Sequence, residues 1–160
     1  MDEGDGSYSL DKMWMSLGIV NKGAGDSFTV KLDNGTVLYP VVSNVQSSKL
    51  EDGGRVLVNY TILSNKVVTD SLKEYYVRIN SVRKILMKGI LDITPAIEDS
   101  IGNDPVKVED IWVSKNQLLN IEISYLGNYK MHYINLVKEP GKLTSADQPI
   151  QLELRHNDNG

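Results

Sequence analysis

Two histidines, His132 and His156, are the side chains best suited to proton transfer near neutral pH in this 160-residue chain. His132 stands inside an alternating run, on the opposite face from Met131 and Tyr133, and a histidine in that position is more often structural than catalytic. His156 precedes the turn-forming residues at the C-terminal end, where we expect it to be exposed. The chain has no cysteine, and it contains no nucleophile elbow, phosphate-binding loop or His-Glu-x-x-His motif. The sequence therefore predicts a protein without catalytic residues that is not an enzyme.

Oxygen-bearing side chains gather between residues 94 and 110, and carboxylate and amide oxygens are ligands for a hard cation such as calcium. They are Glu98, Asp99, Asn103, Asp104, Glu109 and Asp110. Their spacing does not match an EF-hand loop, and acidic side chains in a loop are more often solvated than bound to metal. We therefore predict no metal site and no other cofactor.

A basic cluster with two tyrosines follows one predicted strand, and this combination can bind single-stranded nucleic acid. Its members are Arg78, Arg83, Lys84 and Lys88, with Tyr75 and Tyr76. Residues 1–94 nevertheless carry 11 Lys+Arg and 11 Asp+Glu, and residues 95–160 carry 6 and 10, which gives net charges of zero and −4. Because phosphate binding normally needs a cationic surface, nucleic acid is not an expected partner.

Three further aromatic residues, Trp14, Tyr39 and Trp112, are candidates for docking a sugar or a peptide, although core packing is the commoner use of such side chains. A clustered platform exposed to solvent would favour a glycan as the ligand. Scattered or buried aromatic side chains would favour a protein partner.

Five short runs of β-branched and aromatic residues predict a small closed barrel over residues 8–94, after a flexible acidic tail at residues 1–7. The predicted strands cover residues 13–20, 28–32, 36–39, 55–63 and 75–85. An OB-fold barrel fits best, because a long connection precedes the fourth strand, and an SH3-like barrel is the nearest alternative. Asn34-Gly35 between two alternating runs predicts a hairpin with a type I′ turn.

Period-two alternation assigns the faces of these strands. In the strand over residues 55–63, the side chains expected to face the core are Val56, Val58, Tyr60 and Ile62. The side chains expected to face outward are Arg55, Asn59 and Thr61. In the first strand, the residues that share one apolar face are Met15, Leu17 and Ile19, opposite Trp14 and Ser16.

The alternation stops at residues 95–103, which include Pro95 and Gly102 and are predicted to be a linker. It restarts over residues 104–160, with strands predicted at 106–113, 119–125, 129–137 and 150–155. The chain is therefore predicted to be all-β, with one domain at residues 8–94 and a second at residues 104–160.

Five segments, in order along residues 8–157, together resemble the NigD-like proteins of the Bacteroidales. They are Gly54-Arg-Val-Leu-Val-Asn-Tyr-Thr-Ile62, Asp99-Ser-Ile-Gly-Asn-Asp-Pro105, Asp110-Ile-Trp-Val113, Tyr133-Ile-Asn-Leu-Val137 and Leu154-Arg-His-Asn157. The resemblance implies an N-terminal OB domain, a C-terminal β-sandwich domain and a lipoprotein precursor. The family takes its name from an immunity protein linked to a bacteriocin, and it offers no catalytic residues.

The resemblance also implies a place and a role in the cell. We expect an outer-membrane lipoprotein of the cell envelope, exposed at the surface or in the periplasm. Its expected role is binding or protection of the immunity type, through a protein partner that the sequence does not name; the alternative is a glycan-binding module of the cell surface. The signal peptide and lipid-bearing cysteine of such precursors are absent from this sequence, so contact with the membrane is expected only through an anchor outside it.

The last predicted strand carries Ile150, Leu152 and Leu154 on one face, and residues 157–160 are turn residues with no returning strand. Members of the family continue well beyond the Arg-His-Asn segment, so the second domain is expected to be incomplete. Either residues 150–160 fray, or a second copy covers the edge and gives a homo-oligomer. The cost of leaving three aliphatic side chains in water favours the homo-oligomer.

Overall fold

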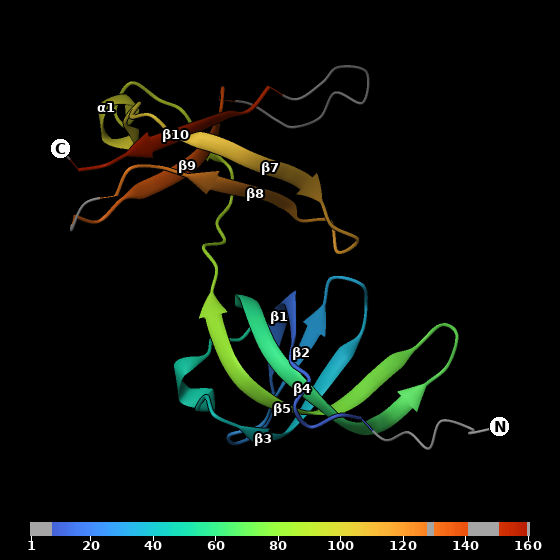
Figure 1. Cartoon of the computed structure of the whole chain (residues 1–160). Helices are drawn as coiled ribbons and strands as arrows, with labels where there is room; N and C mark the ends of the chain where they lie inside the picture. The colour runs from blue at the N-terminus through green and yellow to red at the C-terminus, as the bar shows by residue number, and fades with distance from the viewer. Residues whose placement is uncertain (1–7, 128–129, 141–150, 160) are drawn as a thin grey trace. The chain divides into compact units, whose positions relative to one another are not determined.

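The computed structural model describes residues 8–127, 130–140 and 151–159, so the predicted acidic tail at residues 1–7 and Ile150 lie outside the described residues. The chain divides into two compact units (Figure 1). The first takes the chain up to Met87 together with Ser114–Leu118, and the second takes Lys88–Val113 and the residues from Leu119 onward. Among the described residues, no helix is long and apolar enough to cross a membrane.

Five strands of the first unit close into a barrel in the order β1-β2-β3-β5-β4. They are β1 (Trp14–Lys22), β2 (Phe28–Leu32), β3 (Val37–Ser43), β4 (Arg55–Val68) and β5 (Lys73–Lys84). Strands β3 and β5 run parallel, and the other neighbouring strands are antiparallel. All five predicted strands are present, and the predicted barrel is confirmed.

The strands that bend around the barrel are longer than the alternation predicts. Strand β4 continues to Val68, and its pairing with β5 shifts register at three points, which allows a long hairpin to curve. Strand β3 passes through Pro40, which the sequence predicts as its end. The register between β3 and β5 shifts between Pro40 and Val42, where proline has no N–H to donate to the ladder.

The predicted hairpin at Asn34-Gly35 is present between β2 and β3, but the predicted type I′ turn is wrong. Gly35 has a φ of 92°, whereas Asn34 does not have a positive φ. The Gly35 N–H donates to the Leu32 carbonyl at 2.9 Å, and the Thr36 N–H donates to Asn34 Oδ1 at 3.0 Å. The loop therefore has three residues, Asp33 to Gly35, with the glycine alone in the left-handed region.

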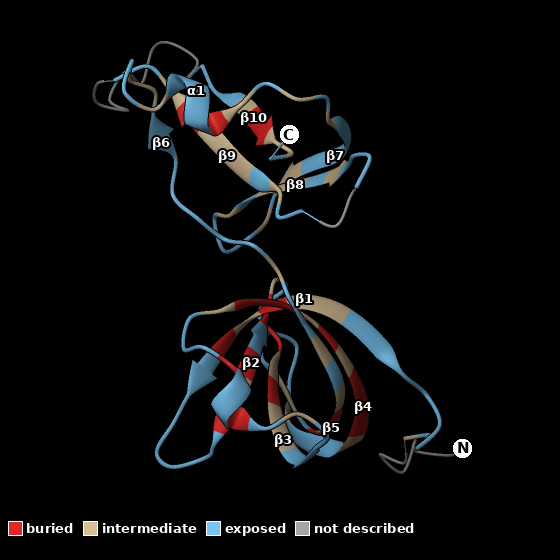
Figure 2. Cartoon of the chain, turned by 90° about the vertical axis from the view of Figure 1, so that its left-hand side faces the viewer, coloured by how far each residue is buried: buried red, intermediate tan, exposed pale blue. Residues whose placement is uncertain are grey.

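The barrel interior has the predicted register in β4, where Val56, Val58, Tyr60 and Ile62 are all buried (Figure 2). The rest of the core cluster consists of Val20, Phe28, Val30, Leu32, Leu38, Leu50, Val77 and Ile79.

In strand β1, the alternating aliphatic residues face away from the barrel core. Met15 is exposed and Leu17 and Ile19 are half-buried, so the face that they share is the outer one, whereas Gly18 and Val20 are buried. A Cβ on Gly18 would lie 2.8 Å from the Lys31 carbonyl oxygen, so this close approach of β1 and β2 requires glycine. Because glycine carries no hydrophobic signal, the pattern did not reveal its inward position.

Two residues predicted to face outward, Arg55 and Thr61, are buried, so that part of the prediction is wrong. Arg55 is buried because both of its terminal nitrogens bond the Asp33 carboxylate, with Nη2 at 2.7 Å from Oδ2. Thr61 Oγ1 accepts a bond from Asn80 Nδ2 at 3.0 Å. Both positions are polar groups whose partners lie on other segments, which alternation along one strand does not show.

The described residues of the second unit form two small sheets and one helical turn. Its elements are β6 (Leu91–Asp92), α1 (Glu98–Ile101), β7 (Lys107–Val113), β8 (Leu119–Ser124), β9 (Tyr133–Lys138) and β10 (Glu153–Asn157). One sheet has the order β10-β9-β6, and the other is the antiparallel pair β7-β8. The predicted linker at residues 95–103 differs from the structure, because it includes α1 and the buried Ile101 and groups with the second unit.

The interior of the second unit is more polar than that of the barrel. Among its described residues, Ile101 and Val137 are the fully buried apolar side chains, and the buried polar ones are Arg155 and His156. Because this unit encloses little apolar area, we infer that the hydrogen bonds of these two polar side chains contribute much of the stability of its fold.

Candidate binding site

Two segments of the second unit that are far apart in sequence, residues 98–105 and 154–158, bind each other closely, and we call this arrangement the clasp. Arg155 Nε donates to the Gly102 carbonyl at 2.5 Å, and its two terminal nitrogens each lie 3.3 Å from Glu98 Oε1. The Asp104 N–H donates to the His156 carbonyl at 2.8 Å. A buried guanidinium bound in this way anchors the loop that carries α1 against β10.

Amide and carboxylate side chains complete the clasp. Asn157 Nδ2 donates to the Ser100 carbonyl at 2.9 Å, and the Asp158 N–H donates to Asp104 Oδ2 at 2.9 Å. Gly102 has a φ of 71°, and a Cβ there would lie 2.6 Å from the His156 carbonyl oxygen. Glycine is therefore required at this position for both its backbone conformation and its lack of a side chain.

Four of the acidic residues considered as metal ligands have structural contacts. Glu98 and Asp104 belong to the clasp, and Glu109 accepts a bond from Ser124 Oγ at 2.6 Å. Asp110 Oδ1 accepts from the N–H of Ile111 at 2.8 Å. Asp99 and Asn103 are exposed. In the part of the chain that the structure describes, no group of three or more His, Asp or Glu side chains is placed to hold a metal ion.

The two histidines, 24 residues apart, lie together. His156 Nδ1 is 3.1 Å from the Pro105 carbonyl oxygen, so Nδ1 carries the proton, and Nε2 is then the acceptor for His132 Nδ1 at 2.8 Å. The ring of Tyr125 lies 4.6 Å from both imidazole rings. The prediction that His156 is exposed is wrong, because the clasp and the rings of His132 and Tyr125 cover it. The pair has the contacts of a structural unit, as the sequence predicts for His132.

Beside the clasp lies a cavity of about 430 Å³, which we call the clasp pocket. Its lining residues are Leu91, Ile97, Ser100, Ile101, Tyr133, Asn135 and Asn157. Tyr133 is 44% exposed, and Asn135 Oδ1 accepts a bond from Lys88 Nζ at 2.8 Å. An apolar lining with one aromatic ring and a few amides suits a small ligand with both apolar and hydroxyl surfaces. Sequence reasoning missed this site, and its only signal was that Tyr133 and Asn135 share one face of a strand.

Strands β7 and β8 form a ribbon with one continuous apolar side, which we call the aliphatic face. Its members are Val108, Ile111, Val113, Leu119, Ile121 and Ile123. They share a side because Val113 pairs with Leu119, Ile111 with Ile121 and Val108 with Ile123, and the register shift between Val108 and Asp110 preserves this arrangement. The exposed fractions are 48% for Val108, 56% for Ile111, 70% for Val113 and 41% for Leu119. Single exposed aliphatic residues are ordinary, but a contiguous set of this kind indicates a contact surface.

The basic residues considered for nucleic-acid binding have separate roles. Arg78 is held by Asn80 Oδ1 at 2.9 Å and by the Leu10 carbonyl at 3.2 Å, so it fastens the segment before β1 to the barrel. Lys88 belongs to the second unit, where it bonds Ile134 and Asn135. Arg83 and Lys84 are exposed at the end of β5. The two tyrosines also have other contacts: Tyr75 meets Tyr8 edge to face at 6.1 Å, and Tyr76 meets Tyr39 at 6.5 Å.

The aromatic residues considered for glycan docking lie on three different strands. Trp14 on β1 lies under the Lys12 ammonium at 4.0 Å, and Tyr39 on β3 lies under that of Lys66 at 4.5 Å. Trp112 is half-buried on β7 in the second unit. Strands β1 and β3 are not neighbours in the barrel, and no recorded ring contact joins these three side chains within the described residues.

Two domains of a known protein family match most of this chain. Residues 17–85 match the NigD-like N-terminal OB domain, and residues 89–160 match the NigD-like C-terminal β-sandwich domain. No curated protein matches the chain. A crystal structure of a protein of unknown function, DUF1344, from Bacteroides vulgatus is similar with a TM-score of 0.72 and 28% identity, over 93% of this chain and 70% of that one.

A second similar crystal structure, from Parabacteroides distasonis, is described as a "Putative TOXIN related protein". It has a TM-score of 0.70 and 28% identity, over 92% of this chain and 70% of that one. The barrel strand order, the sheets of the second unit and the two domain matches agree with one another. The chain belongs to the NigD-like family, with an OB barrel followed by a β-sandwich domain.

Proposed function

We propose that this chain is a non-catalytic binding protein of the bacterial cell envelope that recognises a protein partner through the aliphatic face, in a protective role of the bacteriocin-immunity type. The aliphatic face carries the proposal. Its exposed members, among them Ile111 and Val113, are rigidly positioned on paired strands, and charged residues such as Lys107 and Glu122 point to the other side of the ribbon. A contiguous set of exposed apolar side chains on one side of paired strands marks a protein-binding surface.

Three further observations support this role. The chain belongs to the NigD-like family, and a similar structure is described as toxin related. Trp14 and Tyr39 lie on barrel strands that are not neighbours, and this separation favours a protein over a glycan as the partner. Attachment to the outer membrane is part of the proposal and rests on the resemblance to lipoprotein precursors. Protease treatment of intact cells tests whether the attached protein faces outward, because survival of the full-length protein under these conditions would exclude surface display.

A complementation experiment tests the protective role. A strain that lacks the protein is grown beside bacteriocin-producing neighbours and is given the wild type, I111K/V113K or the control E122Q. Ile111 and Val113 are more than half exposed, so the two lysines should leave folding intact. Glu122 is exposed on the opposite side of β8. We expect wild type and E122Q to restore survival and I111K/V113K to fail at equal protein level. Full protection by I111K/V113K, or equal survival with and without the protein, would contradict the proposal.

Glycan binding remains the second candidate because of the clasp pocket. Tyr133 is partly exposed there, beside the amides of Asn135 and Asn157, and an aromatic ring with nearby amides is suited to a sugar ring. Titration with surface oligosaccharides would detect such a ligand. Under the glycan hypothesis Tyr133→Ala abolishes binding and I111K/V113K does not, so the two candidate functions are separable.

A further inference from the structure

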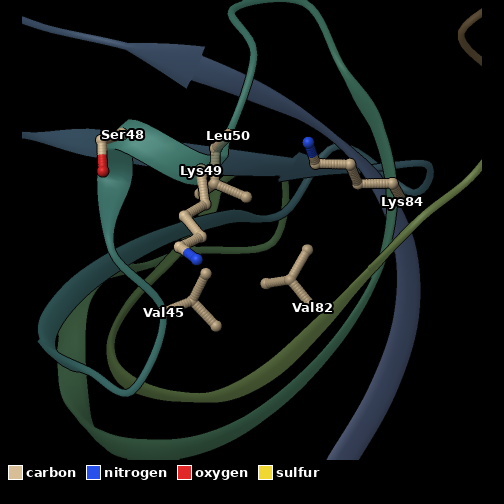
Figure 3. A pocket seen from close by; sticks show the side chains of 6 residues that line it. All are labelled: Val45, Ser48, Lys49, Leu50, Val82 and Lys84. Atoms are coloured by element: carbon tan, nitrogen blue, oxygen red, sulfur yellow. The ribbon is translucent and has the colours of Figure 1, made fainter.

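A cavity of about 610 Å³ opens at one end of the barrel, and we call it the barrel-end pocket (Figure 3). Its lining residues are Val45, Ser48, Lys49, Leu50, Val82 and Lys84. The first four lie in the connection between β3 and β4, around the short 3-10 helix η1 (Ser47–Lys49), and the last two lie at the end of β5. All six belong to the barrel unit, so the lining of the pocket comes entirely from the barrel sheet and the β3–β4 connection.

The floor of the barrel-end pocket is one side of the hydrophobic core. Leu50 is buried in the core cluster, and Val45 and Val82 are half-buried and pack against that cluster. The helix that covers this end has only three residues, and it is held by bonds from the Lys49 and Leu50 N–H groups to the Gln46 and Ser47 carbonyls. Because so short a helix covers little area, apolar side chains remain reachable from solvent beside it.

The rim of the barrel-end pocket is cationic. Lys49 and Lys84 come from different elements, and Figure 3 shows the Lys49 side chain extending toward Val45 and the Lys84 side chain extending toward Leu50. No carboxylate is among the lining residues. Of the ion pairs recorded among the described residues, none involves Lys49 or Lys84, whereas Lys66, Lys107 and Lys138 each have a carboxylate partner. Two ammonium groups beside an apolar floor are complementary to a ligand that has a negative head and an apolar body.

We propose that the barrel-end pocket binds a small organic anion. The apolar body of the ligand rests on Val45, Leu50 and Val82, and its carboxylate or phosphate lies between the ammonium groups of Lys49 and Lys84. The volume is within the range of small-molecule sites, roughly 300–1,000 Å³, and suits a medium-length alkyl chain. This site shares no residue with the aliphatic face, and the proposal does not rest on the proposed protein partner.

Titration of the whole chain with four probes tests the site. The probes are decanoate, decyl phosphate, decanol and inorganic phosphate, each below its aggregation limit, with backbone NMR signals as the readout. We expect both alkyl anions to bind and to shift the signals of residues 45–50 and 82–84. Decanol should bind about tenfold more weakly, and inorganic phosphate alone should not bind. The tighter of the two alkyl anions identifies the head group that the pocket prefers.

Variants separate the charged rim from the floor. K49Q/K84Q should weaken decanoate binding about tenfold and leave decanol binding unchanged, since surface ion pairs contribute modestly and additively. The matched control is Lys31→Gln, an exposed lysine on β2 outside the pocket, and it should have no effect. Val45→Ser should weaken the binding of both decanoate and decanol. The proposal is overturned if decanol binds as tightly as decanoate, if K49Q/K84Q behaves like Lys31→Gln, or if the shifted signals lie outside the pocket.

Discussion

The ion pair between Asp33 and Arg55 joins the β2–β3 loop to the start of β4, and its removal gives the sharpest test of how the barrel is held together. The Arg55 side chain is 3% exposed and that of Asp33 is 22% exposed. Both terminal nitrogens of Arg55 bond the carboxylate. Asp33→Asn keeps the size of the side chain but takes the negative charge away from a buried guanidinium.

The expected loss of stability follows from this burial. Removing one partner of a buried ion pair costs about 3–5 kcal/mol, because the remaining charge stays buried. Asp33 is partly hydrated, so we expect about 2–3 kcal/mol for Asp33→Asn. For a barrel of this size that loss corresponds to a fall of roughly 10–20 °C in its unfolding midpoint. The double variant D33N/R55M should be more stable than Asp33→Asn alone, because it leaves no buried charge.

The pH dependence provides a second readout. The bonds from Arg55 lower the pKa of the Asp33 carboxyl below its usual value, against the opposing effect of burial. Because the pKa is lower in the folded state, the stabilisation is fully present above the unfolded pKa of about 3.9, and it is lost as the pH falls through the folded pKa. The difference in unfolding free energy between wild type and Asp33→Asn should therefore be constant near pH 7 and shrink below about pH 4.

Thermal and urea unfolding, followed by circular dichroism between pH 2.5 and 7, measures both effects. The matched control is Asp26→Asn, an exposed aspartate in the β1–β2 connection, which should change the unfolding free energy by less than about 0.5 kcal/mol. If Asp33→Asn is as stable as Asp26→Asn, or if its deficit does not shrink in acid, the ion pair does not stabilise the barrel as argued.

Two further variants test the core and the clasp. Val58→Asp places a charge in the barrel core, where Val58 has no exposed surface, and should cost several kcal/mol; an unchanged urea midpoint would show that Val58 is not a core residue. Gly102→Ala places a Cβ 2.6 Å from the His156 carbonyl at a φ of 71°, and should lower the stability of the second unit by about 2 kcal/mol or more. Hydrogen exchange of the amides in β9 and β10 measures that change, and protection equal to that of wild type would contradict the fit described for the clasp.

The barrel was predictable because its information is local. In β4 the inward set alternates over a long run, and each inward residue is aliphatic or aromatic, so the period of the strand alone assigns the face. The Asn34-Gly35 pair likewise located a hairpin, because asparagine and glycine between two alternating runs favour a tight turn. The turn type was less predictable, since a three-residue loop with Gly35 in the left-handed region satisfies the same sequence.

The errors have a common physical cause. Arg55 and His156 are polar residues that the sequence assigns to the surface, and each is buried by a partner distant in sequence. The carboxylate of Asp33 accompanies Arg55, and the Pro105 carbonyl and the ring of His132 accompany His156. Burial of a polar group is determined by whether its hydrogen bonds are satisfied, and the sequence of one strand does not state where those bonds go.

Polar side chains with partners distant in sequence are also less available to a ligand. The residues that attract attention by type, such as Arg155 and His156, are occupied in holding strands and loops together. A buried side chain whose bonds are satisfied within the fold has little capacity left for a ligand. The proposed binding surfaces instead include aliphatic residues, such as Val113 on the ribbon and Val45 beside η1, which are not chemically reactive types. Both sites proposed for this NigD-like chain therefore rest on apolar side chains, with Lys49 and Lys84 at the rim of the barrel-end pocket.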